Sequence, residues 1–470
     1  MPSTRTGRGA TILPAPPATR DLVVDFIRVA CMFAVVAVHL LMMGISMGGD
    51  GIGVENPLTS LSWFAQGTWF GQVMPLFFIV GGFASLTSWR SLRRKGGDAG
   101  DYLRNRVLRL VRPTVALYAF LALALWIATA AGVPGELLKV IAAGAGVQLW
   151  FLAAYLLCQA MVPAMARFHE AAPYRTVAAL AAGAVVVDLL RLGLERNPWG
   201  FDSNPIGLLN MVFVWGLLQQ LGFFYADGFF DRFARWKLVA AAAGCYVAQV
   251  PLTQDGLYPV DMLTNQNPPM LPLVLVGLAH VLLVKAAYPW LQRVVQQGWI
   301  QKVMFVVGSR AMTIYLWHLP LIIAMFGLAL VLRLPFPEPA GTEWWLSRPA
   351  FYIVAWALVL LVSNPLVRLE LASTALAPGA SRPARWRIGL ATALAIIPPF
   401  VVMRSALDAW NATWGLVLLV VAVGLVTGRS GSKVEDAGGA GAQGKVVDTG
   451  QSVLKTAGHG KQGSLNLKEP

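Results

Sequence analysis

The stretch DLVVDFIRVACMFAVVAVHLLMMGI, residues 21–45, decides how the rest of the chain is interpreted. It is long enough to cross the roughly 30 Å hydrocarbon core of a bilayer, yet it carries Asp25, Arg28 and His39. Arg28 and His39 are eleven residues apart, which is three helical turns plus roughly 20°, so both side chains lie on one helix face. Along the axis they are separated by roughly 16 Å, about half the hydrocarbon thickness. If Arg28 lies at one membrane boundary, His39 lies near the midplane, and Asp25 can pair with Arg28 at the wet end.

The composition excludes an ordinary soluble domain. Of the 470 residues, 57% are hydrophobic and only 13% are charged, about half the charged fraction of a soluble protein. Apolar runs of nearly spanning length recur along the chain, so we predict an all-α polytopic membrane protein. Cys31, Cys158 and Cys245 all fall inside apolar segments and are expected to be free buried thiols.

Twelve apolar segments are predicted to span the membrane. Several are short or contain proline, which allows tilted or broken helices. The flanking segments 1–20 and 429–470 lack such runs and are expected to be disordered. The predicted spans are 22–45, 66–88, 113–132, 144–166, 176–192, 205–225, 237–251, 270–288, 303–331, 349–370, 387–404 and 411–427.

The distribution of basic residues predicts the orientation. If the N-terminus is cytoplasmic and the sides alternate, most of the 37 Lys and Arg fall on the cytoplasmic side, whereas the acidic residues divide almost evenly. This is the positive-inside pattern, and it predicts a multi-pass plasma or inner membrane protein with both termini in the cytoplasm. The formal net charge of +14 therefore reflects topology, and no nucleic-acid partner is expected.

His39 is the first candidate for chemistry, because ionisable groups at membrane depth are rare and usually line a cavity. Two interpretations stay open. It is either a polar residue hydrogen-bonded between helices or a general base, since a neutral imidazole can accept a proton from a hydroxyl.

The basic loop before the third span is the second candidate. Arg106, Arg109 and Arg112 recur every three residues just before Pro113, so on a short helix they make one broad positive face. Such a block is first a topology determinant. It is also suited to cradle a polyphosphate at the cytoplasmic mouth, because arginine binds phosphate bidentately.

Two further stretches indicate close helix packing beside a cavity. In MPLFFIVGGF, residues 74–83, Gly81 and Gly82 allow helices to approach closely. In VQLWFLAAYLL, Gln148 and Trp150 either face a cavity or belong to the core. His318, which is followed by Pro320, either orients a substrate or is a packed polar group.

Two further patterns do not indicate a catalytic or metal site. The pattern GxSxG occurs at residues 44–48, but it follows a membrane helix rather than a strand, so a serine nucleophile elbow is not expected. The five histidines show no metal-ligand spacing, so no metal is expected.

Taken together, these motifs resemble the acyltransferase 3 family of integral-membrane acyltransferases. The resemblance covers about residues 20–370. Its carrying motifs are Asp25-x-x-Arg28, Arg28-x10-His39, MPLFFIVGGF, Arg106-x-x-Arg109 leading to Pro113, QLWFLAAYLL and SRAMTIYLWHLP at residues 309–320. GGF stands where many members have a Ser-Gly pair, and no soluble esterase-like domain is appended.

The resemblance implies a ten-helix core over residues 21–372, followed by two added helices in 373–428. It implies that His39 is the catalytic histidine, with Arg28 as its partner in the motif. Arg106 and Arg109 would match cytoplasmic arginines that handle the donor, and His318 would match a later family histidine of uncertain role. The donor would be cytoplasmic acyl-CoA, with acetyl or another short acyl group, and the acceptor a hydroxyl of a cell-envelope carbohydrate or glycolipid.

Alternatives remain at this stage. A transporter or lipid flippase would also need ionisable groups at the midplane and a basic cytoplasmic rim. An unrelated membrane O-acyltransferase fold and a non-catalytic scaffold are further rivals. Direct attack on the thioester and a two-step relay through an acyl-histidine both fit the residues, as do a monomer and a homodimer.

Overall fold

Helix α1 (Leu22–Leu41) begins at Asp21 in the computed structural model, which describes residues 21–48, 51–195, 204–376 and 381–427. The Asp21 carboxylate accepts hydrogen bonds from the backbone N–H groups of Val23 and Val24, which a helix start otherwise leaves unpaired. α1 ends four residues before the predicted boundary, and His39 lies in its last turn. The disorder expected for 1–20 and 429–470 concerns residues outside the described ranges.

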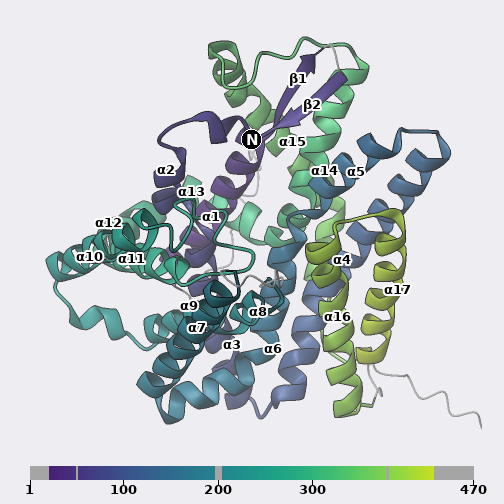
Figure 1. Cartoon of the computed structure of the whole chain (residues 1–470). Coiled ribbons are helices and arrows are strands. Elements are labelled where there is room, and N and C mark those ends of the chain that lie inside the picture. Colours follow the sequence, from purple (N-terminus) through teal and green to yellow (C-terminus); the bar gives the residue numbers. More distant parts are fainter. Residues whose placement is uncertain (1–20, 49–50, 196–203, 377–380, 428–470) are drawn as a thin grey trace, which may run out of the picture.

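Most of the described residues are helical, as predicted (Figure 1). A two-stranded antiparallel hairpin follows α1 and was not anticipated. The first half of the chain contains β1 (Gly44–Gly48), β2 (Gly51–Glu55), η1 (Pro57–Ser60), α2 (Phe64–Gly71), α3 (Met74–Arg94), α4 (Ala99–Ala130), α5 (Gly135–Gly146), α6 (Leu149–Ala171), α7 (Pro173–Glu195), α8 (Asn204–Gly207) and α9 (Asn210–Ala226). The second half contains η2 (Phe229–Arg232), α10 (Arg235–Gln254), α11 (Pro272–Ala286), α12 (Tyr288–Val295), α13 (Gly298–Gly308), α14 (Ala311–Val331), α15 (Thr342–Leu371), α16 (Arg385–Ser405) and α17 (Ala409–Val426).

Within these described ranges, ten helical spans are long and apolar enough to cross a membrane. The predicted span 270–288 corresponds to the pair α11–α12, which is bent by 68° and would make an eleventh. The segment predicted at 237–251 is helix α10, but it is not among the spans, because residues such as Lys237 and Gln249 lower its hydropathy. The chain is a polytopic helical membrane protein, and its described part contains ten spans, or eleven if the bent pair is one span, where twelve were predicted.

Several of the predicted spans are interrupted, and three of them show the pattern clearly. Segment 66–88 is divided between α2 and α3, segment 144–166 between α5 and α6, and segment 303–331 between α13 and α14. Non-helical backbone at membrane depth needs partners for its polar groups, so it occurs where it is buried in protein or lines a cavity. The first two breaks indeed lie on the wall of the cavity described below.

Glycines let α3 and α9 approach closely, as the Gly81–Gly82 pair predicted. A Cβ atom on Gly82 would lie 2.3 Å from the carbonyl oxygen of Gln219, and one on Gly222 would lie 2.0 Å from that of Ile79. Both distances are far shorter than any real carbon–oxygen contact. The close approach therefore requires glycine on both helices, although only the α3 half was recognised from the sequence.

We expect Gly222→Ala to lower the free energy of unfolding by about 1–3 kcal/mol, because the new methyl group forces two backbones apart. Gly244→Ala in α10 is the matched control, since a Cβ there meets nothing within 4 Å, and it should leave stability unchanged or slightly improved. Thermal unfolding of the purified proteins in detergent, followed by thiol-reactive fluorescence of the buried cysteines Cys31, Cys158 and Cys245, measures the difference. Equal effects of the two substitutions would contradict the close-packing account.

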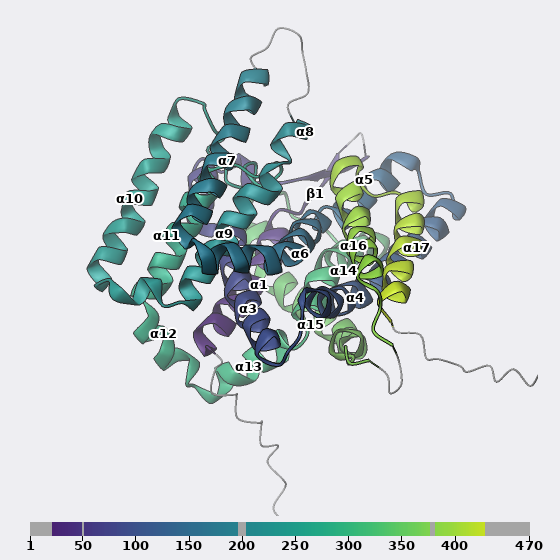
Figure 2. The ribbon, with the colours of Figure 1, turned by 90° about the horizontal axis from the view of Figure 1, so that it is seen from below.

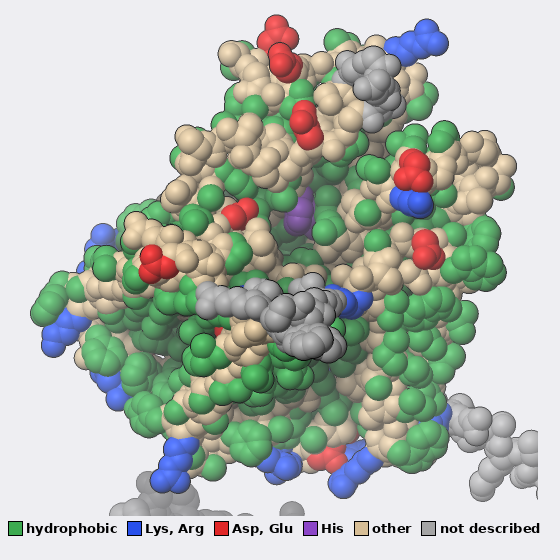
Figure 3. All heavy atoms as spheres, viewed as in Figure 1, with side chains coloured by type: hydrophobic (Ala, Val, Ile, Leu, Met, Phe, Trp, Pro, Cys, Tyr) green, Lys and Arg blue, Asp and Glu red, His purple; other side chains and the backbone are tan. Residues whose placement is uncertain are grey.

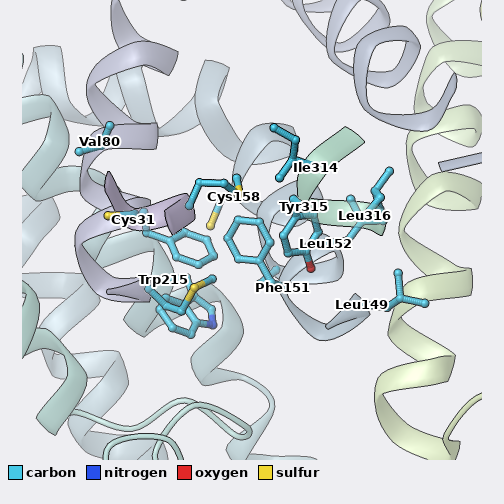
Figure 4. Close-up of a cluster of buried hydrophobic side chains, with 14 of the residues drawn as sticks. Cys31, Val80, Leu149, Phe151, Leu152, Cys158, Trp215, Ile314, Tyr315 and Leu316 are labelled. Atoms are coloured by element: carbon cyan, nitrogen blue, oxygen red, sulfur yellow. The ribbon is translucent and has the colours of Figure 1, made fainter. Parts of the chain in front are cut away.

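The last two helices lie against the rest of the bundle. α16 contacts α4 and α6, and α17 contacts α4 and α16. Both views show this pair at one side of the molecule, next to α4 and away from α10–α12 (Figures 1 and 2). The core between these sides includes aromatic residues from several helices, and Figure 4 shows Phe151, Trp215 and Tyr315 gathered there.

Candidate functional site

A cavity of about 560 Å³ lies between helix α1, helix α14 and two of the interrupted spans, the pair α2–α3 and the pair α5–α6. Its volume falls within the usual range for small-molecule sites. A hollow with a histidine side chain visible inside it opens on the face shown in Figure 3. The lining residues are Val35, Val38, His39, Met42, Gly71, Gln72, Val73, Met74, Ala143, Gly146, Val147, Gln148, Trp150, Phe151, Leu263, Gln266, Asn267, Tyr315, Val402, Met403, Arg404, Ala406 and Leu407.

His39 reaches a second histidine across this site. Its Nδ1 lies 3.0 Å from Nε2 of His318, although the two residues are 279 positions apart in the chain. His318 is fully buried. It is the eighth residue of the 21-residue helix α14, so the pair lies about 10 Å along that helix from its first residue. The pair is therefore well inside the span, even though His39 belongs to the last turn of α1.

The hydrogen bonds indicate which nitrogen carries each proton. Nδ1 of His318 lies 2.6 Å from the carbonyl oxygen of Tyr315, which can only accept, so this nitrogen donates. In a neutral ring, Nε2 of His318 is then an acceptor, and Nδ1–H of His39 donates to it. Nε2 of His39 then keeps its lone pair, and the ring also contacts the backbone of Val35, one turn earlier in α1. This is the arrangement required of a general base.

Gln148, which lies in the break between α5 and α6, fixes the backbone around His318. Pro320 has no N–H, so it leaves the carbonyl group of Leu316, four residues earlier, without its usual helical partner. The Gln148 side chain supplies the missing donor, with its Nε2 2.8 Å from the Leu316 oxygen. The Tyr315 hydroxyl in turn donates to the Gln148 carbonyl oxygen. α14 therefore stays continuous through the proline, and its histidine is held in place.

The cavity wall also contains Trp150, which stacks on Trp215 with ring centroids 5.7 Å apart. Phe151 lies beside it and meets Tyr315 edge to face at 4.8 Å. The wall near the histidines is thus rigid and largely apolar. Gln148 is 2% exposed, and its Oε1 has no hydrogen-bond partner among the described residues, which leaves one acceptor for a bound molecule.

Arg28 lies near the opposite end of α1 and is paired with Asp25 at 3.2 Å, as its spacing predicted. It does not contact His39, and the two residues keep the separation that the helix imposes. The phenol of Tyr155 on α6 lies within electrostatic range of both Arg28 and Arg106. The Arg106 guanidinium also sits over the Tyr102 ring, 4.9 Å from its centroid. Arg28 and Arg106 therefore border one region between α1, α4 and α6.

The other two arginines of the basic block point elsewhere. Arg109 is exposed and lies within electrostatic range of Glu370, whose carboxylate accepts from the backbone N–H groups at the start of α14. Arg112 donates to the carbonyl oxygens of Ala372 and Ser373 beyond the end of α15. The three residues thus do not form one positive face, because α4 packs between different neighbours on its two sides.

Sequence reasoning missed two parts of this site. It did not join His318 to His39, although Pro320 after His318 indicates a freed carbonyl that needs a polar partner. It also left the last two helices without a role, whereas the end of α16 lines the cavity. In the described part of the chain, no group of three or more His, Cys, Asp or Glu side chains could hold a metal ion.

The fold and site define a polytopic helical membrane protein with a buried histidine pair between its spans, one member of which, His39, lines a cavity. Residues 21–367 match the acyltransferase-domain model of the acyltransferase 3 family, and the chain belongs to this family. No curated protein and no solved structure matches the chain. Membership identifies the protein as a membrane acyltransferase and decides against the transporter and scaffold alternatives.

Proposed function

We propose that this acyltransferase moves a short acyl group, such as acetyl, from acyl-CoA to a hydroxyl of a cell-envelope carbohydrate or glycolipid. The observation that carries the proposal is the cavity-lining His39, whose Nδ1–H donates to His318, so that its Nε2 keeps the lone pair. An acyl acceptor needs such a base, because a neutral hydroxyl is a weak nucleophile.

In the proposed reaction, Nε2 of His39 removes the proton from the acceptor hydroxyl while the oxygen attacks the thioester carbonyl carbon. The carbon–sulfur bond then breaks, and the CoA sulfur leaves with the proton that His39 holds. The ring thus returns to its starting state without an oxidant or a metal. The apolar aromatic wall near Trp150 keeps water away from the thioester, which suppresses hydrolysis.

We place the donor on the side of the membrane where α1 begins, and we take that side as the cytoplasm. Basic side chains gather along this lower edge in Figure 3, as the positive-inside rule requires. Arg28 and Arg106 lie toward it. The residues that line the cavity come instead from the C-terminal ends of α1 and α16 and from the N-terminal end of α3. This division favours an acceptor that enters from the outer side, in a plasma membrane protein with both termini inside.

Mass spectrometry of envelope glycans and lipids tests the proposal. Cells that produce the wild-type chain should contain acylated species that are missing from cells with a His39→Ala chain. The purified wild-type protein should consume acetyl-CoA when the affected species is supplied. Identical spectra together with no release of CoA thiol would refute the proposed donor and acceptor classes.

Arg106→Gln is expected to raise the KM for acyl-CoA about tenfold, with a smaller effect on kcat, because one charge-assisted contact to the donor phosphates is lost. Arg112→Gln is the matched control. Since Arg112 binds the carbonyl oxygens of Ala372 and Ser373, its loss should lower thermal stability and leave the KM nearly unchanged. Initial rates at varied acyl-CoA concentration separate the two, and a normal KM for Arg106→Gln would exclude that residue from donor binding.

A further inference from the structure

The cavity that contains His39 has one wall from outside the family-matched region. The match ends at residue 367, whereas Val402, Met403, Arg404, Ala406 and Leu407 line the cavity. These residues belong to the C-terminal end of α16 and the turn that follows it. The two added helices are therefore part of the site rather than a separate appendage.

Several contacts hold this wall in place. Gly146 at the end of α5 packs so closely against it that an added Cβ would lie 2.8 Å from Cβ of Leu407. Ala406 has a left-handed backbone, with φ of 62°, which is strained for a residue other than glycine. The Asn411 side chain stabilises this turn by donating to the Ala406 carbonyl oxygen at 3.0 Å. The turn is thus built to a defined shape beside the cavity.

The charge on this wall is unbalanced. Arg404 is the one permanently charged side chain among the lining residues of the described chain, and no Asp or Glu lines the cavity. Its side chain is exposed and makes no hydrogen bond or ion pair with any described residue. Other arginines of the described chain, such as Arg28, Arg104 and Arg112, do have such partners. A guanidinium that is exposed at a cavity and lacks a partner in the described chain favours an anionic group on the molecule that enters.

We propose that α16 and α17 select the acceptor, and that Arg404 binds a carboxylate or phosphate group on it. This rests on the proposed function, because it assumes that the cavity receives the acceptor. The acceptor class is then an acidic sugar or an anionic glycolipid, with the reacting hydroxyl at His39 and the negative group at the end of α16. Arg404 is a specificity-determining residue and takes no part in the acyl-transfer step.

The electrostatic part can be tested without any substrate. Met403→Cys places a thiol on the cavity wall, while the native cysteines Cys31, Cys158 and Cys245 are all buried. The rates of modification by an anionic and a cationic methanethiosulfonate reagent are measured on the full-length protein. Adding Arg404→Gln should lower the anionic-to-cationic rate ratio by about tenfold, since one nearby charge changes both rates in opposite directions. Adding Arg387→Gln, at the other end of α16, should leave the ratio unchanged, and an unchanged ratio with Arg404→Gln would overturn the proposal.

Acceptor kinetics provide the second test. A neutral hexoside, a uronic acid and a hexose phosphate are compared as acceptors with acetyl-CoA as donor. Arg404→Gln should raise the KM for the preferred acidic acceptor about tenfold without changing its kcat, and Arg404→Lys should recover part of the loss. Preference for the uronic acid would indicate that the site recognises a carboxylate, and preference for the hexose phosphate would indicate that it recognises a phosphate. An equal rise in KM for the neutral and acidic acceptors would refute this inference. The proposed function would still stand in that case if acyl transfer continued to depend on His39.

Discussion

His39→Ala is expected to lower kcat for acyl transfer by about a thousandfold or more, while the protein still folds. A positioned general base typically contributes 10²–10⁴-fold to rate, and here no second described group is placed to take its role. His318 does not replace it, because its side chain is fully buried and is not among the residues that line the cavity. The measurement is the initial rate of acetyl-CoA consumption with acceptor present, on protein that elutes as a single species in detergent.

His280→Ala is the control for this result. His280 is also a buried histidine within the helical bundle, on α11, but it does not line the described cavity. Its replacement should leave kcat within about twofold of the wild type, because it removes a polar group without touching the reacting atoms. If the His39 variant keeps more than a tenth of the activity, the base is another group and the assignment of His39 fails.

The same preparation separates direct attack from a relay. Rapid quenching with labelled acetyl-CoA in the absence of acceptor should leave the protein unlabelled if the hydroxyl attacks the thioester directly. A labelled protein that loses its label on addition of acceptor would instead show a covalent intermediate on His39. The Nε2 lone pair of His39 serves either route, so the geometry alone favours neither.

Much of this fold follows from local sequence patterns. The 3.6-residue helical period places Arg28 and His39 on one face, and the Asp25–Arg28 pair forms as its spacing predicts. Hydropathy identifies most spans, because length and apolar composition alone decide them. Gly82 indicates a close helix contact that the structure contains. These features depend on residues within one or two helical turns of one another.

The parts that could not be predicted depend on distant pairs. Whether His318 reaches His39 is decided by how α14 packs on α1 and by the Gln148 bond that fixes α14. Hydropathy averages over a whole window, so it does not register the two-residue break before α6. The end of α16 reaches the cavity only because the added helices fold back on α4 and α6. No period or spacing in the sequence carries that information.

Replacing His318 should reveal whether it acts through His39, and the choice of substitution decides the outcome. His318→Leu removes the acceptor for Nδ1–H of His39, so that ring is free to rotate or to carry its proton on Nε2, where it cannot act as a base. We expect kcat to fall about a hundredfold, with little change in the KM for acyl-CoA. His318→Gln keeps an amide oxygen that can accept the bond from His39, and it should recover a substantial part of the lost rate.

The comparison between these two variants distinguishes positioning from simple packing. If His318 only filled space between α14 and α1, leucine would be tolerated at least as well as glutamine, since both occupy a similar volume and leucine avoids burying an unpaired amide. If His318 instead accepts the Nδ1–H of His39, the glutamine variant should have a higher kcat than the leucine variant, even if the glutamine variant is less stable. Thermal unfolding measured on the same samples separates stability from rate. A leucine variant that is as active as the glutamine variant would show that the hydrogen bond between the two imidazoles does not contribute to catalysis.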